Sequence, residues 1–170
     1  MNLKLKETIR NEIKTILDRE TDRGLIHTVS YYLADMLRGV SKRLVFHNSQ
    51  DKEDRFEDFL RRDGSVFVSP SSLRGLDLYG DKCRWIYFLK CPFLDLADRH
   101  TQQRLYGSGK WGRIWYTSEA INNILQGSGR GVRDFDDWCR IYLGDKQIGR
   151  LLEQNASLFP RWFREAIIYE

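Results

Sequence analysis

Gln126–Arg133 reads Gln-Gly-Ser-Gly-Arg-Gly-Val-Arg, a glycine-rich loop that carries two arginines three residues apart. An apolar helical run precedes this loop, and the apolar strand Ile141–Leu143 follows it after an acidic turn. Arginine binds phosphate through two parallel hydrogen bonds and does not lose its charge. Two guanidinium groups on a tight backbone are therefore suited to stabilise the charge that develops on a phosphoryl group during its transfer.

Two other interpretations fit parts of the same loop. Its glycines suggest a dinucleotide-binding G-x-G-x-x-G loop, but the third glycine of that motif falls on Val132 and the preceding segment has helical periodicity. The loop alone fits a helix C-cap and turn with solvated arginines equally well. The surrounding sequence has to distinguish an anion-binding loop from a structural turn.

The loop and its surroundings resemble motif VI of superfamily-two helicases, in which Gln-x-x-Gly-Arg-x-x-Arg precedes an acidic turn and a strand. The continuation Asp136–Asp145 is similar to the XPD/DinG branch of these helicases. The resemblance implies that Gln126, Arg130 and Arg133 act on ATP across an interdomain cleft, with Arg133 as an arginine finger. It also implies that Gly129 lies beside the nucleotide.

Length and composition fit one soluble domain. The 170 residues are 41% hydrophobic and 31% charged, and no apolar run is long enough to cross a bilayer. The net charge of +4 is compatible with a polyanionic partner. The three cysteines and three histidines lack metal-ligand spacing, so no metal site is predicted. The N-terminus has no apolar signal core, and we expect a cytoplasmic location.

Helical and strand periodicities alternate along the chain and predict an α/β fold with a mostly parallel sheet and helices on both faces. The helicase resemblance further implies that this α/β fold is a three-layer RecA-like domain. We expect a single domain over residues 1–170, with a leading helix at 1–20 and a core at 24–165. The segment after residue 92 has no regular pattern until residue 118. Helices are expected at 30–39, 51–62, 118–126, 148–152 and 161–168, and strands at 25–28, 44–46, 66–68, 83–90 and 138–143.

Ligands of such sheets bind beyond the carboxyl ends of the strands, which favours the loops after Ile26, Val68 and Tyr142. We expect the arginine loop to lie among these binding loops. Gly24–Thr28 resembles the motif IV region of the helicases, and this resemblance implies that Thr28 and Ser30 contact a nucleic-acid phosphate at a helix N-terminus. A plain helix N-cap explains either hydroxyl equally well.

The segment Ser69–Leu78 resembles motif V, whose hydroxyl residues face nucleic acid and whose Gly-x-Asp end faces the nucleotide. Carried over residue by residue, the resemblance implies that Ser69 and Ser71 contact the nucleic-acid backbone. It likewise places Gly75 and Asp77 near ATP.

Residues 99–116 interleave basic and aromatic side chains. Such a mixture can follow a phosphate backbone and stack bases, at about 1–3 kcal/mol per base. Lys110 and Trp111 lie between glycines and are the best candidates for exposed nucleic-acid contacts. Trp115 and Tyr116, in contrast, resemble a family stretch that leads into motif VI, and they are expected to pack against the protein.

Phosphate-loop chemistry is absent from the sequence. Gly75 and Gly80 have P-loop spacing, but no Lys-Ser/Thr pair follows them and no D-E-x-H box occurs. The chain alone is therefore not expected to hydrolyse ATP. The resemblance implies the second motor domain of an ATP-dependent helicase, whose N-terminal RecA-like ATPase domain would hold ATP and Mg²⁺, with single-stranded DNA as partner and no membrane. The alternative is a stand-alone nucleic-acid-binding or scaffolding domain of the same fold.

Overall fold

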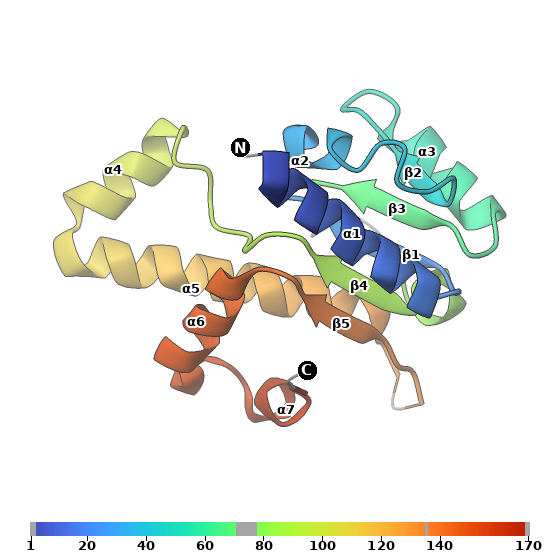
Figure 1. The fold of residues 1–170 in the computed structure, drawn as a ribbon. Coiled ribbons are helices and arrows are strands. Elements are labelled where there is room, and N and C mark those ends of the chain that lie inside the picture. Colours follow the sequence, from blue (N-terminus) through green and yellow to red (C-terminus); the bar gives the residue numbers. More distant parts are fainter. Residues whose placement is uncertain (1–2, 71–77, 135, 169–170) are drawn as a thin grey trace.

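The computed structural model describes residues 3–70, 78–134 and 136–168, and its centre is a five-stranded sheet (Figure 1). The strand order is β2-β3-β1-β4-β5, and all neighbouring strands are parallel. The predicted α/β fold with a parallel sheet is thus confirmed. The strands are β1 (Gly24–His27), β2 (Leu44–Phe46), β3 (Val66–Ser69), β4 (Trp85–Phe88) and β5 (Arg140–Leu143).

The three central strands are buried on both faces, which explains why each reads as a nearly continuous apolar run. Their register brings His27 at the end of β1 beside Ser69 of β3 and Phe88 of β4. The last residues of these three strands therefore lie side by side at one edge, the carboxyl edge of the sheet.

Two helices cover one face of the sheet, α1 (Leu3–Arg19) and α2 (Tyr31–Asp35). Ile13 and Leu17 of α1 are buried in one cluster with Ile26 of β1, because they recur on a single side of the helix. The sequence predicted a longer second helix, to residue 39. Instead, the chain turns after α2, where Gly39 has a φ of +75°.

The other face is covered by α3 (Lys52–Arg61), α5 (Gly109–Ser128), α6 (Lys146–Gln154) and α7 (Arg161–Glu165), which completes the three-layer arrangement. The buried side chains of this layer are mainly aromatic and aliphatic. They include Phe59, Phe67, Ile86, Ile121, Ile124, Ile148, Leu151 and Phe163. Three short 3-10 helices connect the larger elements: η1 (Gly80–Lys82), η2 (Gly129–Gly131) and η3 (Ala156–Leu158).

The segment expected to be irregular after residue 92 is instead largely helical. α4 (Arg99–Gly107) and α5 form a hairpin that extends beyond the carboxyl edge of the sheet (Figure 1). The two helices meet closely at Gly112, where a Cβ atom would lie 2.2 Å from the Leu105 carbonyl oxygen. The apolar pattern missed this hairpin because several of its large apolar side chains are exposed, among them Tyr106, Trp111 and Ile114.

Candidate nucleotide and nucleic-acid sites

The candidate residues lie at two opposite edges of the sheet. The arginine loop connects α5 to β5, so it lies at the amino ends of the strands, whereas Thr28 and Ser69 are at the carboxyl ends. The expectation that the arginine loop lies with the carboxyl-end loops is therefore wrong. In a parallel sheet covered by helices, every helix-to-strand connection returns the chain to the amino edge.

Close packing fixes the arginine loop. α5 ends at Ser128, and Gly129 and Gly131 bound a short 3-10 turn. Gly131 is buried, and a Cβ atom there would lie 2.4 Å from the Sγ of Cys139, the residue just before β5. Gly129 has a φ of −74°, so this is not the left-handed glycine cap of many helices. The glycine at 131 is thus required by the close approach of the Cys139 side chain.

The long side chains of the loop reach the surface, whereas Ser128 is buried. Arg133 and Gln126 are exposed and Arg130 is half-buried. The Arg133 guanidinium carbon lies 4.9 Å from the centre of the Tyr79 ring, within the range of a cation–π contact. Tyr79, which follows the motif V segment in the sequence, thus contacts the arginine loop at this edge. Within that segment, Ser71, Gly75 and Asp77 lie outside the described residues.

A carboxylate anchors the acidic turn that follows the arginines. Asp137 accepts hydrogen bonds from the backbone N–H of Gly80 at 3.1 Å and from Nη1 of Arg84 at 2.6 Å. Burial acts to raise the pKa of Asp137, but these hydrogen bonds outweigh it and hold the pKa below its usual value. Arg84 also pairs with Asp81 and lies over the Trp138 ring. Sequence reasoning missed this network because its partners are far apart along the chain.

The carboxyl edge contains an unusual turn between the motif IV hydroxyls. Val29 has a φ of +57°, a conformation that β-branched residues rarely adopt. Ser30 caps α2, since its Oγ accepts a hydrogen bond from the Leu33 N–H at 3.2 Å. The Thr28 hydroxyl is buried and donates to the Ser30 carbonyl at 3.1 Å. Ser30 is therefore an N-cap residue, and the hydrogen bond of Thr28 stabilises the turn that leads to it.

Ser69 is also buried, and its partner is a histidine that the sequence did not single out. His47 Nδ1 lies 2.8 Å from the Asn48 carbonyl oxygen, and its Nε2 lies 2.8 Å from the Ser69 Oγ. Since a carbonyl oxygen can only accept, Nδ1 donates to it, and in the neutral imidazole Nε2 accepts from the Ser69 hydroxyl. The His47 ring also stacks on Phe67, which fixes its position.

His27 is a second buried histidine at the carboxyl edge. Neither of its ring nitrogens has a hydrogen-bond partner among the described residues. Burial lowers its pKa to about 4, and the nearby Pro70 backbone opposes this shift only in part. The imidazole is therefore neutral at physiological pH, and it packs against the Phe88 ring at 5.6 Å.

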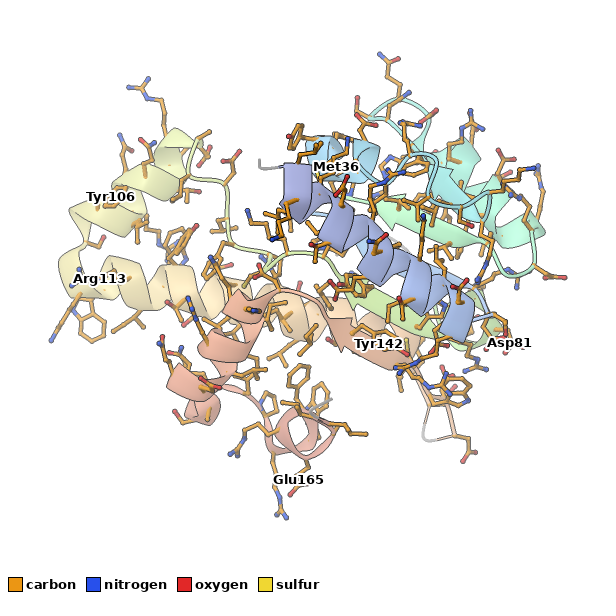
Figure 2. All side chains as sticks on the ribbon, viewed as in Figure 1. Met36, Asp81, Tyr106, Arg113, Tyr142 and Glu165 are labelled. Carbon is orange, nitrogen blue, oxygen red and sulfur yellow. The ribbon has the colours of Figure 1, made fainter. Side chains whose placement is uncertain are left out.

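Lys110 and Trp111 lie in the first turn of α5. The Trp111 side chain is 66% exposed, and the Lys110 ammonium lies 5.2 Å from its ring centre. Figure 2 labels Tyr106 and Arg113 on the same hairpin, at the opposite end of the molecule from Asp81. The expectation for Trp115 and Tyr116 is confirmed, because both are at least half-buried and their polar atoms have internal partners.

Helix α5 joins the two candidate sites. It begins at the carboxyl side with Lys110 and Trp111, and it ends at the arginine loop just after Gln126. Its 20 residues span about 30 Å at 1.5 Å per residue. A ligand that binds at one end of α5 is thus well outside contact distance of a ligand at the other.

The described residues contain no group of side chains suited to a metal ion. The cysteines are free, and Cys83 and Cys91 are buried. A hydrogen bond with Cys139 and burial both raise the pKa of Cys83, and burial raises the pKa of Cys91 to about 12. These two thiols therefore stay protonated and are poor metal ligands. Across the part of the chain that the structure describes, no helix has the length and apolar character of a membrane span.

Comparison with known families decides the identity of the domain. Residues 13–166 match the family described as helicase C-terminal domain. The chain belongs to this family. The predicted resemblance to the C-terminal RecA-like domain of helicases of the XPD/DinG type is thereby confirmed. No match was found among curated protein sequences.

Solved structures share the fold of this helicase C-terminal domain. An XPD helicase superposes with a TM-score of 0.73 and 16% identity, over 93% of this chain and 31% of the other. Xpd4 of S. tokodaii superposes with a TM-score of 0.61 and 16% identity, over 89% of this chain and 32% of the other. An XPD in its apo form superposes with a TM-score of 0.61 and 14% identity, over 88% of this chain and 33% of the other. At such identities the likeness concerns the fold alone, and the chain spans about a third of each XPD structure.

Proposed function

We propose that this domain is the second motor domain of an ATP-dependent helicase that acts on single-stranded DNA. The observation that supports this most strongly is the arginine loop, in which the packed Gly131 fixes the backbone between Arg130 and Arg133. If the arginine loop were only a structural turn, the contact between Arg133 and Tyr79 would have no role. Membership of the helicase C-terminal family supports the proposal that these arginines would act on the phosphates of ATP.

The amino edge of the sheet would form one wall of the nucleotide cleft. Arg130 and Arg133 would stabilise charge on the transferring phosphoryl group, with Gln126 and Gly129 beside them. Gly75 and Asp77 would lie close to the same nucleotide, since their segment leads into Tyr79. The phosphate cradle and the ligands of Mg²⁺ would come from an N-terminal RecA-like ATPase domain, because this sequence lacks both Walker motifs.

The carboxyl edge and the helical hairpin would form part of the single-strand track. Ser30 is half-exposed at this edge, and the buried Thr28 and Ser69 hold the turns around it. Ser71 would extend this row of hydroxyls toward the DNA backbone. These residues and the arginine loop lie at opposite edges of the sheet, so DNA and ATP could bind at the same time.

Lys110 and Trp111 would belong to the same track, and their side chains support single-stranded nucleic acid as its ligand. An exposed indole offers a stacking surface to any base, and the adjacent ammonium can contact a phosphate. The pair stands at the turn between α4 and α5, which is the end of the hairpin farthest from the sheet (Figure 1). This placement is compatible with one continuous strand that crosses the hydroxyl residues and continues along the hairpin.

ATP hydrolysis by the chain alone and by the chain joined to its first helicase domain tests the proposal. We expect no turnover from the chain alone, with or without single-stranded DNA, and DNA-stimulated turnover from the joined protein. DNA-stimulated hydrolysis by the pure isolated chain would contradict the proposal. DNA binding that persists while no ATPase partner restores hydrolysis would instead favour the stand-alone binding domain.

A further inference from the structure

His47 directly follows β2 at the carboxyl edge of the sheet, and it is only 6% exposed. Its Nδ1 donates to the Asn48 carbonyl oxygen at 2.8 Å, and its Nε2 lies 2.8 Å from Ser69 Oγ. One face of the ring stacks on Phe67, with 5.1 Å between the ring centres. Both ring nitrogens and one ring face are thus engaged, so the imidazole is held in one orientation.

The fixed imidazole contacts Tyr31, the first residue of α2. The two rings meet edge to face, with 5.6 Å between their centres and 77° between their planes, which is a favourable aromatic geometry. Among the described residues, the Tyr31 side chain makes no hydrogen bond and no other ring contact. The contact with His47 is therefore the directional interaction that restrains Tyr31.

The turn between β1 and α2 has a conformation that its sequence disfavours. Val29 has a φ of +57°, and a β-branched residue keeps such a conformation only where surrounding contacts fix it. At one end of the turn, the Thr28 N–H donates to the Ser69 carbonyl oxygen at 3.1 Å. At the other end, Tyr31 is connected through His47 to the same serine. His47 thus closes a ring of contacts around the strained turn.

Ser30 lies inside this turn and is half-exposed. Its Oγ accepts from the Leu33 N–H at 3.2 Å, and its hydroxyl hydrogen has no acceptor among the described residues. This hydrogen can therefore be donated to a phosphate oxygen, as in many contacts to a nucleic-acid backbone. The backbone of the turn sets the direction of that donor.

We propose that His47 is a positioning residue, which holds the turn at residues 28–31 so that the Ser30 hydroxyl can donate to a phosphate of single-stranded DNA. This inference rests on the function proposed above. Ser69 is the fixed point, because it is paired within the sheet, and Tyr31 is the group that His47 restrains. A donor that is fixed before binding loses less conformational entropy than a mobile one.

Fluorescence anisotropy with single-stranded DNA tests the inference on this chain. His47→Leu should lower affinity roughly threefold to tenfold, which corresponds to the net contribution of one hydrogen bond. The salt slope should not change, since a neutral hydroxyl displaces no counterion. His47→Phe keeps a ring against Phe67 and Tyr31, so it should retain most of the affinity although it loses hydrogen bonds and melts at a lower temperature.

Phe163→Leu is the control for lost stability. Phe163 is buried in α7, on the face of the sheet opposite to α2, so its replacement should lower the melting temperature and leave DNA affinity unchanged. An equal loss of affinity in Phe163→Leu and His47→Leu would mean that affinity follows stability alone, which would overturn the inference.

A double-mutant cycle shows whether His47 acts through Ser30. His47→Leu should cause no further loss of affinity in a Ser30→Ala background, because the group that it positions is absent. Hydrogen exchange followed by NMR gives a readout without DNA. The Leu33 N–H, which Ser30 caps, should exchange slowly in wild type and His47→Phe and faster in His47→Leu. Circular dichroism confirms that each variant is folded.

The outcomes separate this inference from the proposed function. Equal losses of affinity in His47→Leu and His47→Phe would overturn the inference, as would a loss from His47→Leu that persists in the Ser30→Ala background. Normal affinity in His47→Leu together with a loss in Ser30→Ala would overturn the inference alone. If neither this chain nor the enzyme that contains the first helicase domain bound single-stranded DNA, the proposed function would fail and the inference with it.

Discussion

Arg84 Nη1 lies 2.6 Å from Asp137 Oδ1, and this contact joins the start of β4 to the turn that follows the arginine loop. The two side chains are only 18% and 11% exposed, so neither is simply solvated. Arg84 also pairs with Asp81 and stacks over Trp138, and Asp137 also binds the Gly80 backbone. The pair is thus the centre of a network that connects three segments of the amino edge.

Removing the carboxylate of this network should loosen the amino edge. Asp137→Ala leaves Arg84 and the Gly80 N–H without their partner, and we expect the melting temperature to fall by a few degrees. Asp136→Ala changes an exposed carboxylate in the same turn and should have almost no effect. Thermal unfolding followed by circular dichroism compares the two variants. Equal melting temperatures for both would mean that the network does not stabilise the fold.

Two glycines of the arginine loop should respond oppositely to alanine. In Gly131→Ala the new methyl group would lie 2.4 Å from Cys139 Sγ and 2.6 Å from its Cβ. We expect a destabilisation of about 1–3 kcal/mol, as for other overpacked sites. Gly129→Ala meets no atom within 4 Å and should be neutral or slightly stabilising. Urea unfolding gives both free energies, and a well-tolerated Gly131→Ala would contradict the packing of this loop.

His27 should make stability depend on pH. Its pKa is about 4 in the folded protein, below the value of about 6.5 that an unfolded histidine has. The unfolded state therefore binds the extra proton first, and stability is lost as pH falls from about 6.5 to about 4. The full loss amounts to about 3 kcal/mol at 1.36 kcal/mol per pKa unit.

The measurement is the free energy of unfolding between pH 4 and pH 7.5, in wild type and in His27→Leu. The leucine variant cannot bind the proton, so its stability should fall less steeply on acidification. His100→Leu changes an exposed histidine and serves as the matched control. Identical pH dependence in wild type and His27→Leu would show that His27 does not titrate with a depressed pKa.

Much of the fold could be predicted because burial on both faces of a sheet produces apolar runs. This is why β1, β3 and β4 were found, and why alternation with helices indicated parallel strands. The hairpin of α4 and α5 was missed for the opposite reason, since Trp111 and Ile114 are exposed and break the one-sided apolar pattern. Periodicity reports burial, and a projecting helix is only partly buried.

The sequence predicts only those parts of the candidate site whose residues are close together along the chain. The arginine loop is contiguous and could be recognised, and Ser30 could be named as a possible N-cap from its position alone. The pairing of Arg84 with Asp137 spans 53 residues, and that of His47 with Ser69 spans 22. Such pairs exist only once the sheet has set the register of its strands. The edge of the sheet at which the arginines lie likewise follows from the chain path.

Binding of single-stranded DNA by this domain alone should be weak and should fall steeply with salt. The net charge is only +4, and the proposed contacts are largely to phosphate. Lys110→Ala should lower affinity and reduce the salt slope by about one unit, as expected for the loss of one phosphate contact. Fluorescence anisotropy over a range of salt concentrations measures both quantities. Tight or salt-insensitive binding would favour the stand-alone binding domain.

Trp111 should contribute stacking rather than charge. Trp111→Ala should weaken single-stranded DNA binding by about 1–3 kcal/mol, with no change in the salt slope. Trp162 of α7 is exposed to a similar degree, 59% against 66%, but lies on a different element. Trp162→Ala is therefore the matched control and should bind as wild type. Equal effects of the two substitutions would remove the hairpin from the proposed track.

Arg130 and Arg133 should differ in what their removal changes. Arg130 is half-buried beside the packed Gly131, so Arg130→Ala is expected to lower both ATP turnover and the melting temperature. Arg133 is exposed, and its replacement should leave the melting temperature close to wild type. Thermal unfolding and ATP turnover, measured on the same preparations, distinguish a structural arginine from a catalytic one.

Arg133→Ala, in the enzyme that contains the first helicase domain, should lower kcat for ATP by a factor on the order of 10³, as for other arginine fingers. Nucleotide affinity should change far less, because the guanidinium is proposed to stabilise charge that develops only in the transition state. Arg133→Lys should restore little turnover, since an ammonium is a point charge and cannot form two parallel hydrogen bonds. It also lacks the flat surface that stacks on Tyr79. Wild-type turnover in a folded Arg133→Ala enzyme would mean that the arginine loop is a structural turn.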